Sequence, residues 1–154
     1  MHVTFSCHCF TEGFSAEFHQ DHHRYTYLGE LRAFDPVRHE CSLQLPAIIQ
    51  KLLKGRVFDL GESWTYEAQI QLNSGPGVFV QYSIFFSLKK DKTIATPALV
   101  MYVKSAYQKS LGQMISATTK GQRFPSLAGQ ISGAFPPQSK PTRPQPKKKK
   151  KKAP

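Results

Sequence analysis

Two segments in which apolar and polar residues alternate, followed by a third that is nearly all apolar, constrain the fold of this chain more than any other feature. Successive side chains of a strand point to opposite faces, so each alternating segment would place one apolar face against a core, and a nearly all-apolar segment is expected of a central strand. The turn sequence Asn-Ser-Gly-Pro-Gly between the first two favours antiparallel neighbours, and the charged stretch 89–97 is expected to be a loop. We therefore predict a largely antiparallel sheet with strands over residues 64–72, 78–88 and 98–107.

An amphipathic helix is expected before these strands. Asp35 followed by Pro36 is typical of a helix start, with Asp as the N-cap. Apolar residues then recur every three or four positions as far as Gly55, the expected C-cap. Pro46 interrupts this pattern and predicts a kink or two abutting helices. The predicted class is α+β, with a twisted, mostly antiparallel sheet, one kinked helix packed on it and a disordered basic C-terminal tail.

The N-terminal residues also alternate, which predicts a strand that carries Cys7 and Cys9 on its apolar face. Residues 11–23 look irregular, and a second short strand is expected over residues 24–28. Two of the three cysteines are separated by one residue, which favours a reducing, cytoplasmic compartment over a disulfide. No apolar run approaches the roughly 20 residues of a membrane-spanning helix.

The charges divide the chain into a neutral body and a cationic end. Residues 1–108 contain ten basic and ten acidic residues, whereas residues 109–154 contain nine Lys, two Arg and no Asp or Glu, the source of the net charge of +11. We expect a globular domain over residues 1–108, a partly ordered linker or docking segment over 109–135, and a disordered Pro/Lys-rich tail over 136–154.

The tail gives the clearest indication of a partner. Adjacent lysines on a flexible segment bind DNA or RNA phosphates without sequence preference, by releasing counterions. The leading hypothesis is therefore a small non-catalytic accessory protein that contacts nucleic acid through this tail; a solvated tail without a partner is the alternative. The candidate contacts are Lys140, Arg143, Lys147, Lys148, Lys149, Lys150, Lys151 and Lys152.

The segment 120–135 has apolar residues at three- and four-residue steps. This spacing suits a short helix that docks on its own domain or on a partner. A protein-interaction adaptor is therefore another hypothesis, with Phe124, Leu127, Ile131 and Phe135 as the docking residues.

Histidine and cysteine crowd the N-terminal region, and zinc accepts both. The chain lacks the C-x₂-C spacing of a zinc knuckle, so we expect no cofactor and keep zinc as an alternative. If a site exists, its ligands would come from Cys7, Cys9, His19, His22 and His23.

The sequence contains no G-x-S-x-G, P-loop or H-E-x-x-H motif and does not reveal an enzymatic reaction. A metal-free ribonuclease needs only a few cationic or phenolic side chains, and Arg56, Lys104 and Tyr107 are the candidates. Over residues 36–107, the order of a helix and three strands resembles the RelE/ParE class of toxin ribonucleases. The opening residues 2–10 are similar to those of small uncharacterised bacterial proteins associated with mobile elements. The resemblance to the toxin ribonucleases implies a nucleic-acid context and assigns no catalytic residue.

Overall fold

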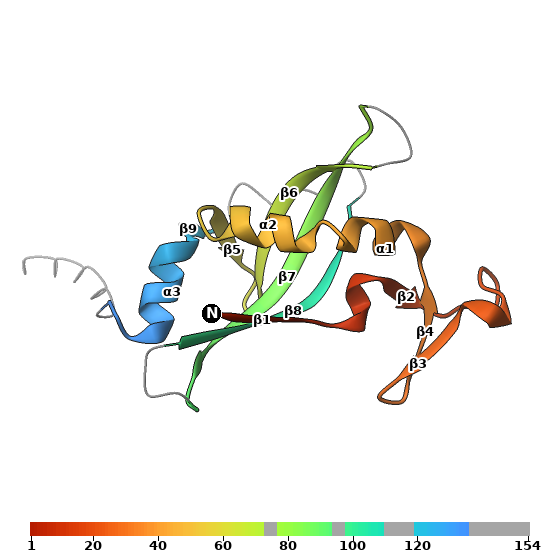
Figure 1. Ribbon diagram of the computed structural model, residues 1–154, viewed down its shortest axis with the longest axis horizontal. Helices are drawn as coiled ribbons and strands as arrows, with labels where there is room; N and C mark the ends of the chain where they lie inside the picture. The colour runs from red at the N-terminus through yellow and green to blue at the C-terminus, as the bar shows by residue number, and fades with distance from the viewer. Residues whose placement is uncertain (73–76, 94–97, 110–118, 136–154) are drawn as a thin grey trace, which may run out of the picture.

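The computed structural model describes residues 1–72, 77–93, 98–109 and 119–135. They form a large sheet with helices on one face and a small three-stranded sheet at one end (Figure 1). The α+β class and the mostly antiparallel sheet are confirmed. The expected tail, residues 136–154, lies outside the described residues.

The large sheet contains the three strands expected from the two alternating segments and the apolar segment that follows them. Its order is β1-β8-β7-β6-β5-β9, and every pair is antiparallel except β1 with β8. The short strands β5 and β9, which close one side, lack an alternating signal and were not expected. The bounds are His2–Phe5 for β1, Arg56–Asp59 for β5, Trp64–Gln71 for β6, Phe79–Asp91 for β7, Ala98–Gln108 for β8 and Gly121–Arg123 for β9.

The central strand β7 is longer than expected. It continues through Lys89 to Asp91, so the prediction that a loop begins at residue 89 is wrong. These residues pair with the beginning of β8, and the pairing compensates for their low strand propensity. The register shifts between Phe85 and Phe86, which leaves Lys104 of β8 as the extra residue of a bulge.

The helical segment consists of two abutting helices, one of the two outcomes that Pro46 predicted. Helix α1 spans Pro36–Ser42 and helix α2 spans Leu45–Leu52. The Asp35 carboxylate accepts hydrogen bonds from the amides of Val37 and Arg38, which confirms its capping role. Pro46 sits in the first turn of α2, where its missing N–H costs no helical hydrogen bond.

The N-terminal strand ends earlier than predicted. Strand β1 stops at Phe5, and Cys7–Cys9 forms a 3₁₀ turn, η1, so the two cysteines are not on a strand. Both are nevertheless buried, because the turn carries them under the helices. The Thr11 hydroxyl donates a hydrogen bond to the Cys7 carbonyl, so this polar group of the turn is paired where it is buried.

A small sheet forms within residues 11–34, where an irregular stretch was expected over residues 11–23. Its order is β2-β4-β3, with β2 over Thr11–Gly13, β3 over Arg24–Tyr27 and β4 over Glu30–Phe34. A short 3₁₀ turn, η2 (Asp21–His23), precedes β3. Strand β3 confirms the strand expected there. Strands β2 and β4 carry many polar residues, and their pairing rather than local pattern defines them.

Helix α3, Phe124–Ser132, packs on the large sheet beside α2 (Figure 1). The amide of Phe124 donates a hydrogen bond to the carbonyl of Gly55. Phe124 and Leu127 are buried in the core, Ile131 is half-buried against it, and Phe135 is exposed. Residues 121–132 therefore share one core with residues 2–108, and the fold continues past the boundary expected at residue 108.

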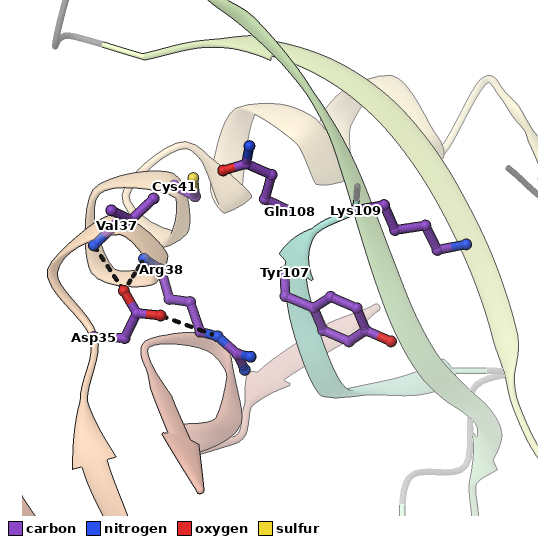
Figure 2. Close-up of a pocket in the computed structure, with 7 residues that line it drawn as sticks. All are labelled: Asp35, Val37, Arg38, Cys41, Tyr107, Gln108 and Lys109. Carbon is purple, nitrogen blue, oxygen red and sulfur yellow. Dashed lines mark hydrogen bonds and ion pairs between the residues drawn. The ribbon is translucent and has the colours of Figure 1, made fainter. Parts of the chain in front are cut away.

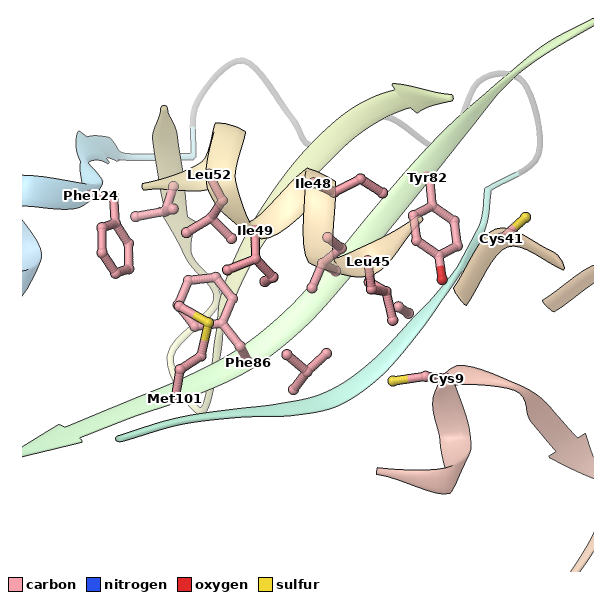
Figure 3. Packing of buried hydrophobic residues seen from close by; sticks show 14 of the residues in the cluster. Cys9, Cys41, Leu45, Ile48, Ile49, Leu52, Tyr82, Phe86, Met101 and Phe124 are labelled. Carbon is pink, nitrogen blue, oxygen red and sulfur yellow. The ribbon is translucent and has the colours of Figure 1, made fainter. Parts of the chain in front are cut away.

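The core lies between the helices and one face of the large sheet. Figure 3 shows Leu45, Ile48, Ile49 and Leu52 of α2 above that face. Alternate β7 residues from Val80 to Leu88 point into it and are buried, as the alternation predicted.

Candidate functional site

A cavity of about 240 Å³ opens between α1 and the end of β8. Figure 2 shows side chains from both elements around it. The wall contains two cations, one carboxylate, a phenol ring, an amide and a thiol. The lining residues are Asp35, Val37, Arg38, Cys41, Tyr107, Gln108 and Lys109.

Arg38 is held in this wall by contacts on three sides. Its Nε lies 3.3 Å from the Asp35 carboxylate, and its Nη1 donates to the Thr11 carbonyl at 3.0 Å. Its guanidinium carbon lies 5.4 Å from the centre of the Tyr107 ring. A guanidinium fixed in this way loses little entropy when it binds a further acceptor.

The Tyr107 ring also contacts a residue of the neighbouring strand β7. It stacks on Phe85 with 5.2 Å between ring centres. The Lys109 ammonium lies 5.8 Å from the centre of the Phe85 ring and 3.2 Å from the Glu67 carboxylate. Arg38 and the Tyr107 hydroxyl are groups that can bind a small anion such as a phosphate.

The other two expected ribonuclease residues lie outside this cavity. The Lys104 ammonium donates to the Glu62 carbonyl, and Arg56 donates to the Gly121 carbonyl. Strands β5 and β8 are three strand spacings apart in the sheet, about 14 Å. Arg56, Lys104 and Tyr107 are thus not brought together. Sequence reasoning missed Arg38, whose contact with Tyr107 is long-range and has no local signature.

The histidines and cysteines proposed as zinc ligands do not converge on one site, although the ring centres of His22 and His23 are 4.0 Å apart and those of His19 and His23 are 6.3 Å apart. Cys7 and Cys9 are buried in η1, whereas His22 and His23 belong to η2. His19 has its Nε2 2.9 Å from a Glu12 carboxylate oxygen. Within the described residues, no group of three or more His, Cys, Asp or Glu side chains is placed to hold a metal ion.

Two cysteines, Cys9 and Cys41, and the tyrosine Tyr82 are fully buried in the core. Figure 3 shows the Tyr82 hydroxyl pointing toward the side of the core where Cys9 and Cys41 lie. Burial raises the pKa of both thiols to about 11 and also raises the pKa of the Tyr82 phenol. The Tyr82 hydroxyl has no hydrogen-bond partner in the structure described. These thiols are protonated at neutral pH and are poor nucleophiles.

Charge is distributed unevenly over the fold. Residues 11–42, here called the N-terminal lobe, contain six of the ten carboxylates and three arginines, a net charge of −3. Each arginine forms an ion pair inside the lobe: Arg24 with Asp21, Arg32 with Glu30 and Arg38 with Asp35. The pKa of Glu30 is lowered by its hydrogen bonds to His8 and then Arg32.

The opposite end of the fold is basic. We call the following residues the basic end; all are exposed, and none forms an ion pair with a described residue: Lys51, Lys54, Arg56, Lys89, Lys90, Lys92 and Arg123. Figure 1 shows α3 and the end of α2 on this side, away from the small sheet. The body is thus neutral in sum but not in its distribution of charge.

The tail cations, Lys140, Arg143 and the six lysines Lys147–Lys152, lie outside the described residues. The docking residues are described, and the helix that contains Phe124, Leu127 and Ile131 contacts its own sheet. In the described parts of the chain, no helix is long and apolar enough to cross a membrane. The cytoplasmic location stays a prediction.

Comparison with known proteins identifies a family. The YjaZ family matches residues 1–132, and the chain therefore belongs to the YjaZ family. No curated protein and no solved structure matches it. The match ends at the last residue of α3, so the matched residues include β9 and α3 and do not include the polybasic tail.

Proposed function

We propose that this member of the YjaZ family binds nucleic acid through its phosphate backbone, as a non-catalytic accessory protein. The tail supplies the main contact. Its six consecutive lysines, Lys147–Lys152, meet phosphates without reading base sequence.

The observation that supports this proposal is the place where the tail begins. It follows α3, at the end of the fold opposite the acidic N-terminal lobe. A polyanion approaching the tail therefore meets the basic end and not the carboxylates of the lobe. Screening over about 8 Å at physiological ionic strength weakens repulsion from the distant lobe.

Fluorescence anisotropy with DNA and RNA oligonucleotides across a salt series tests the proposal. The full chain is compared with a variant in which all six tail lysines are replaced by Gln, which preserves chain length. We expect tight binding of the wild type at low salt. In the variant, the salt slope should fall by roughly 0.9 for each duplex phosphate that is no longer neutralised. Equal binding and equal slopes for the two proteins would contradict the role of the tail.

Ribonuclease activity is a second candidate, favoured by the shared position of Arg38 and Tyr107 at one cavity. In this candidate, the 2′-hydroxyl of the RNA loses its proton to water and attacks the adjacent phosphorus, and the bond from phosphorus to the 5′ oxygen breaks. The Tyr107 hydroxyl donates a proton to that leaving oxygen and regains one from solvent. Arg38 stabilises the charge that develops on the phosphate. Incubation of RNA with the wild type and with Tyr107→Phe, with a 2′-deoxy oligonucleotide as control, tests it. Cleavage that survives Tyr107→Phe, or no cleavage by either protein, would exclude this role.

A further inference from the structure

Two arginines face each other across the edge of the large sheet. Arg56 of β5 and Arg123 of β9 are register partners, and both are exposed. Like charges directly opposite on antiparallel strands are destabilising. Arg56 donates one hydrogen bond to the Gly121 carbonyl, and no described carboxylate forms an ion pair with either arginine. An anion bound between the two guanidinium groups would remove this repulsion.

A second group of cations lies where β7 ends. Lys89, Lys90 and Lys92 are exposed within four consecutive positions. The carboxylate in their midst, Asp91, accepts hydrogen bonds from the Thr93 amide and hydroxyl at 2.8 and 2.6 Å. The Asp91 carboxylate is thus hydrogen-bonded within its own turn. In the described structure, it forms no ion pair with the neighbouring lysines.

Helix α3 connects the two groups. The amide of its first residue, Phe124, donates a hydrogen bond to the carbonyl of Gly55, which precedes Arg56 in the chain. The helix packs against β7 and β8. The helix has nine residues and no acidic one, so it spans about 13 Å without a repelling charge. This length corresponds to roughly eight phosphate charges along a duplex axis.

We propose that the basic end is a second nucleic-acid contact, built by the fold itself, along which the phosphate backbone runs beside α3. This inference rests on the proposed function, because the same bound strand continues onto the tail. The fold contact fixes where the strand lies, whereas the tail lysines add affinity. The acidic N-terminal lobe at the other end disfavours the reverse orientation.

Two full-length variants test the fold contact. One carries Lys89→Gln, Lys90→Gln and Lys92→Gln; the other carries Arg56→Gln and Arg123→Gln. The control carries Ala16→Glu, Gln20→Glu and Thr26→Glu, exposed positions of the N-terminal lobe. It changes the net charge as much as the lysine variant does, at the opposite end of the fold.

Binding of duplex DNA and RNA oligonucleotides is measured across the same salt series, and folding of each variant is checked by urea unfolding. We expect each basic-end variant to lower the salt slope by roughly 0.9 for each duplex phosphate that it no longer neutralises, and the lobe control to leave the slope nearly unchanged. The arginine variant should also unfold at equal or higher urea, because it removes a repulsive pair.

The ways in which the test can fail are distinguishable. If the full chain does not bind at all, the proposed function and this inference both fail. If the wild type binds and folded basic-end variants keep its slope, while the six-lysine tail variant binds more weakly, only the fold contact is excluded. A lobe control whose slope falls as much as that of the lysine variant would show an effect of net charge and would also overturn the inference.

Discussion

The guanidinium carbon of Arg38 lies 5.4 Å from the centre of the Tyr107 ring, and this contact joins α1 to the end of β8. The same arginine donates to the Thr11 carbonyl, which also accepts a hydrogen bond from Arg32. Arg38 therefore connects the small sheet, the first helix and the large sheet.

Replacement of Arg38 by Ala should lower the free energy of unfolding by about 1–3 kcal/mol, because it removes the cation–ring contact and leaves Asp35 without its ion-pair partner. Arg38→Lys should be less destabilising, since it keeps the charge but not the planar fork. Urea unfolding measures both. A change within about 0.5 kcal/mol for Arg38→Ala, the range of an ordinary surface substitution, would contradict this structural role.

Helix α3 ends in a close contact between Gly129 and Phe135. The Phe135 amide donates to the Gly129 carbonyl at 3.0 Å, and a Cβ added at Gly129 would overlap the Phe135 ring. Gly129→Ala should therefore destabilise the protein. In the Phe135→Ala background the same change should be neutral or stabilising by up to about 1 kcal/mol, because alanine favours a helix. Urea unfolding of the four proteins compares the two effects, and equal effects in both backgrounds would show that the contact does not form.

The buried thiols make the stability depend on alkaline pH. The pKa of Cys9 and of Cys41 is about 11 in the folded chain, above the usual value near 9, so the folded state holds these protons more tightly. Their contribution is complete below pH 9 and is lost as the pH rises toward 11. Urea midpoints should fall over this range, and less steeply for the Cys9→Ala, Cys41→Ala double variant. An equal fall in both proteins would assign the effect to other groups.

A chain that ends at residue 108 should not fold like the full protein. It lacks β9 and α3, and with them the buried residues Phe124 and Leu127. A chain that ends at residue 135 keeps the core and should melt cooperatively, near the temperature of the full chain. Circular dichroism during heating compares the two. A cooperative transition of the 108-residue chain at the full chain's temperature would contradict the place of α3 in the core.

The parts of the fold that sequence predicted are those with a regular period, a long apolar run or a Pro or Asp signal at a helix start. Strands β6, β7 and β8, the Asp35 cap and the break at Pro46 follow from local patterns. Strands β2, β4, β5 and β9 are short and have no alternating pattern. Strands β2 and β9 depend on partners far along the chain, whereas β4 and β5 also pair with the neighbouring strands β3 and β6. Cys7 and Cys9 alternate like strand residues, yet the N–H of Phe10 bonds the Cys7 carbonyl and closes a turn.

The candidate site was predictable only in part. Tyr107 could be identified because it ends a strong strand, but its neighbour Arg38 comes from another element. The charges of residues 1–108 sum to zero. In the fold, however, most of the carboxylates lie in the N-terminal lobe, and exposed cations lie at the basic end. A sum over residues 1–108 hides this separation, because the acidic lobe is one contiguous segment whereas the basic end combines residues from separate elements of the fold.

Amide chemical-shift mapping of the full chain during titration with an oligonucleotide tests the central claim most directly. We predict shifts at the basic end, in residues 51–56, 89–92 and 121–124, with residues 11–42 unchanged. Shifts concentrated in residues 11–42, or none in the fold although the oligonucleotide binds, would contradict a nucleic-acid contact at the basic end.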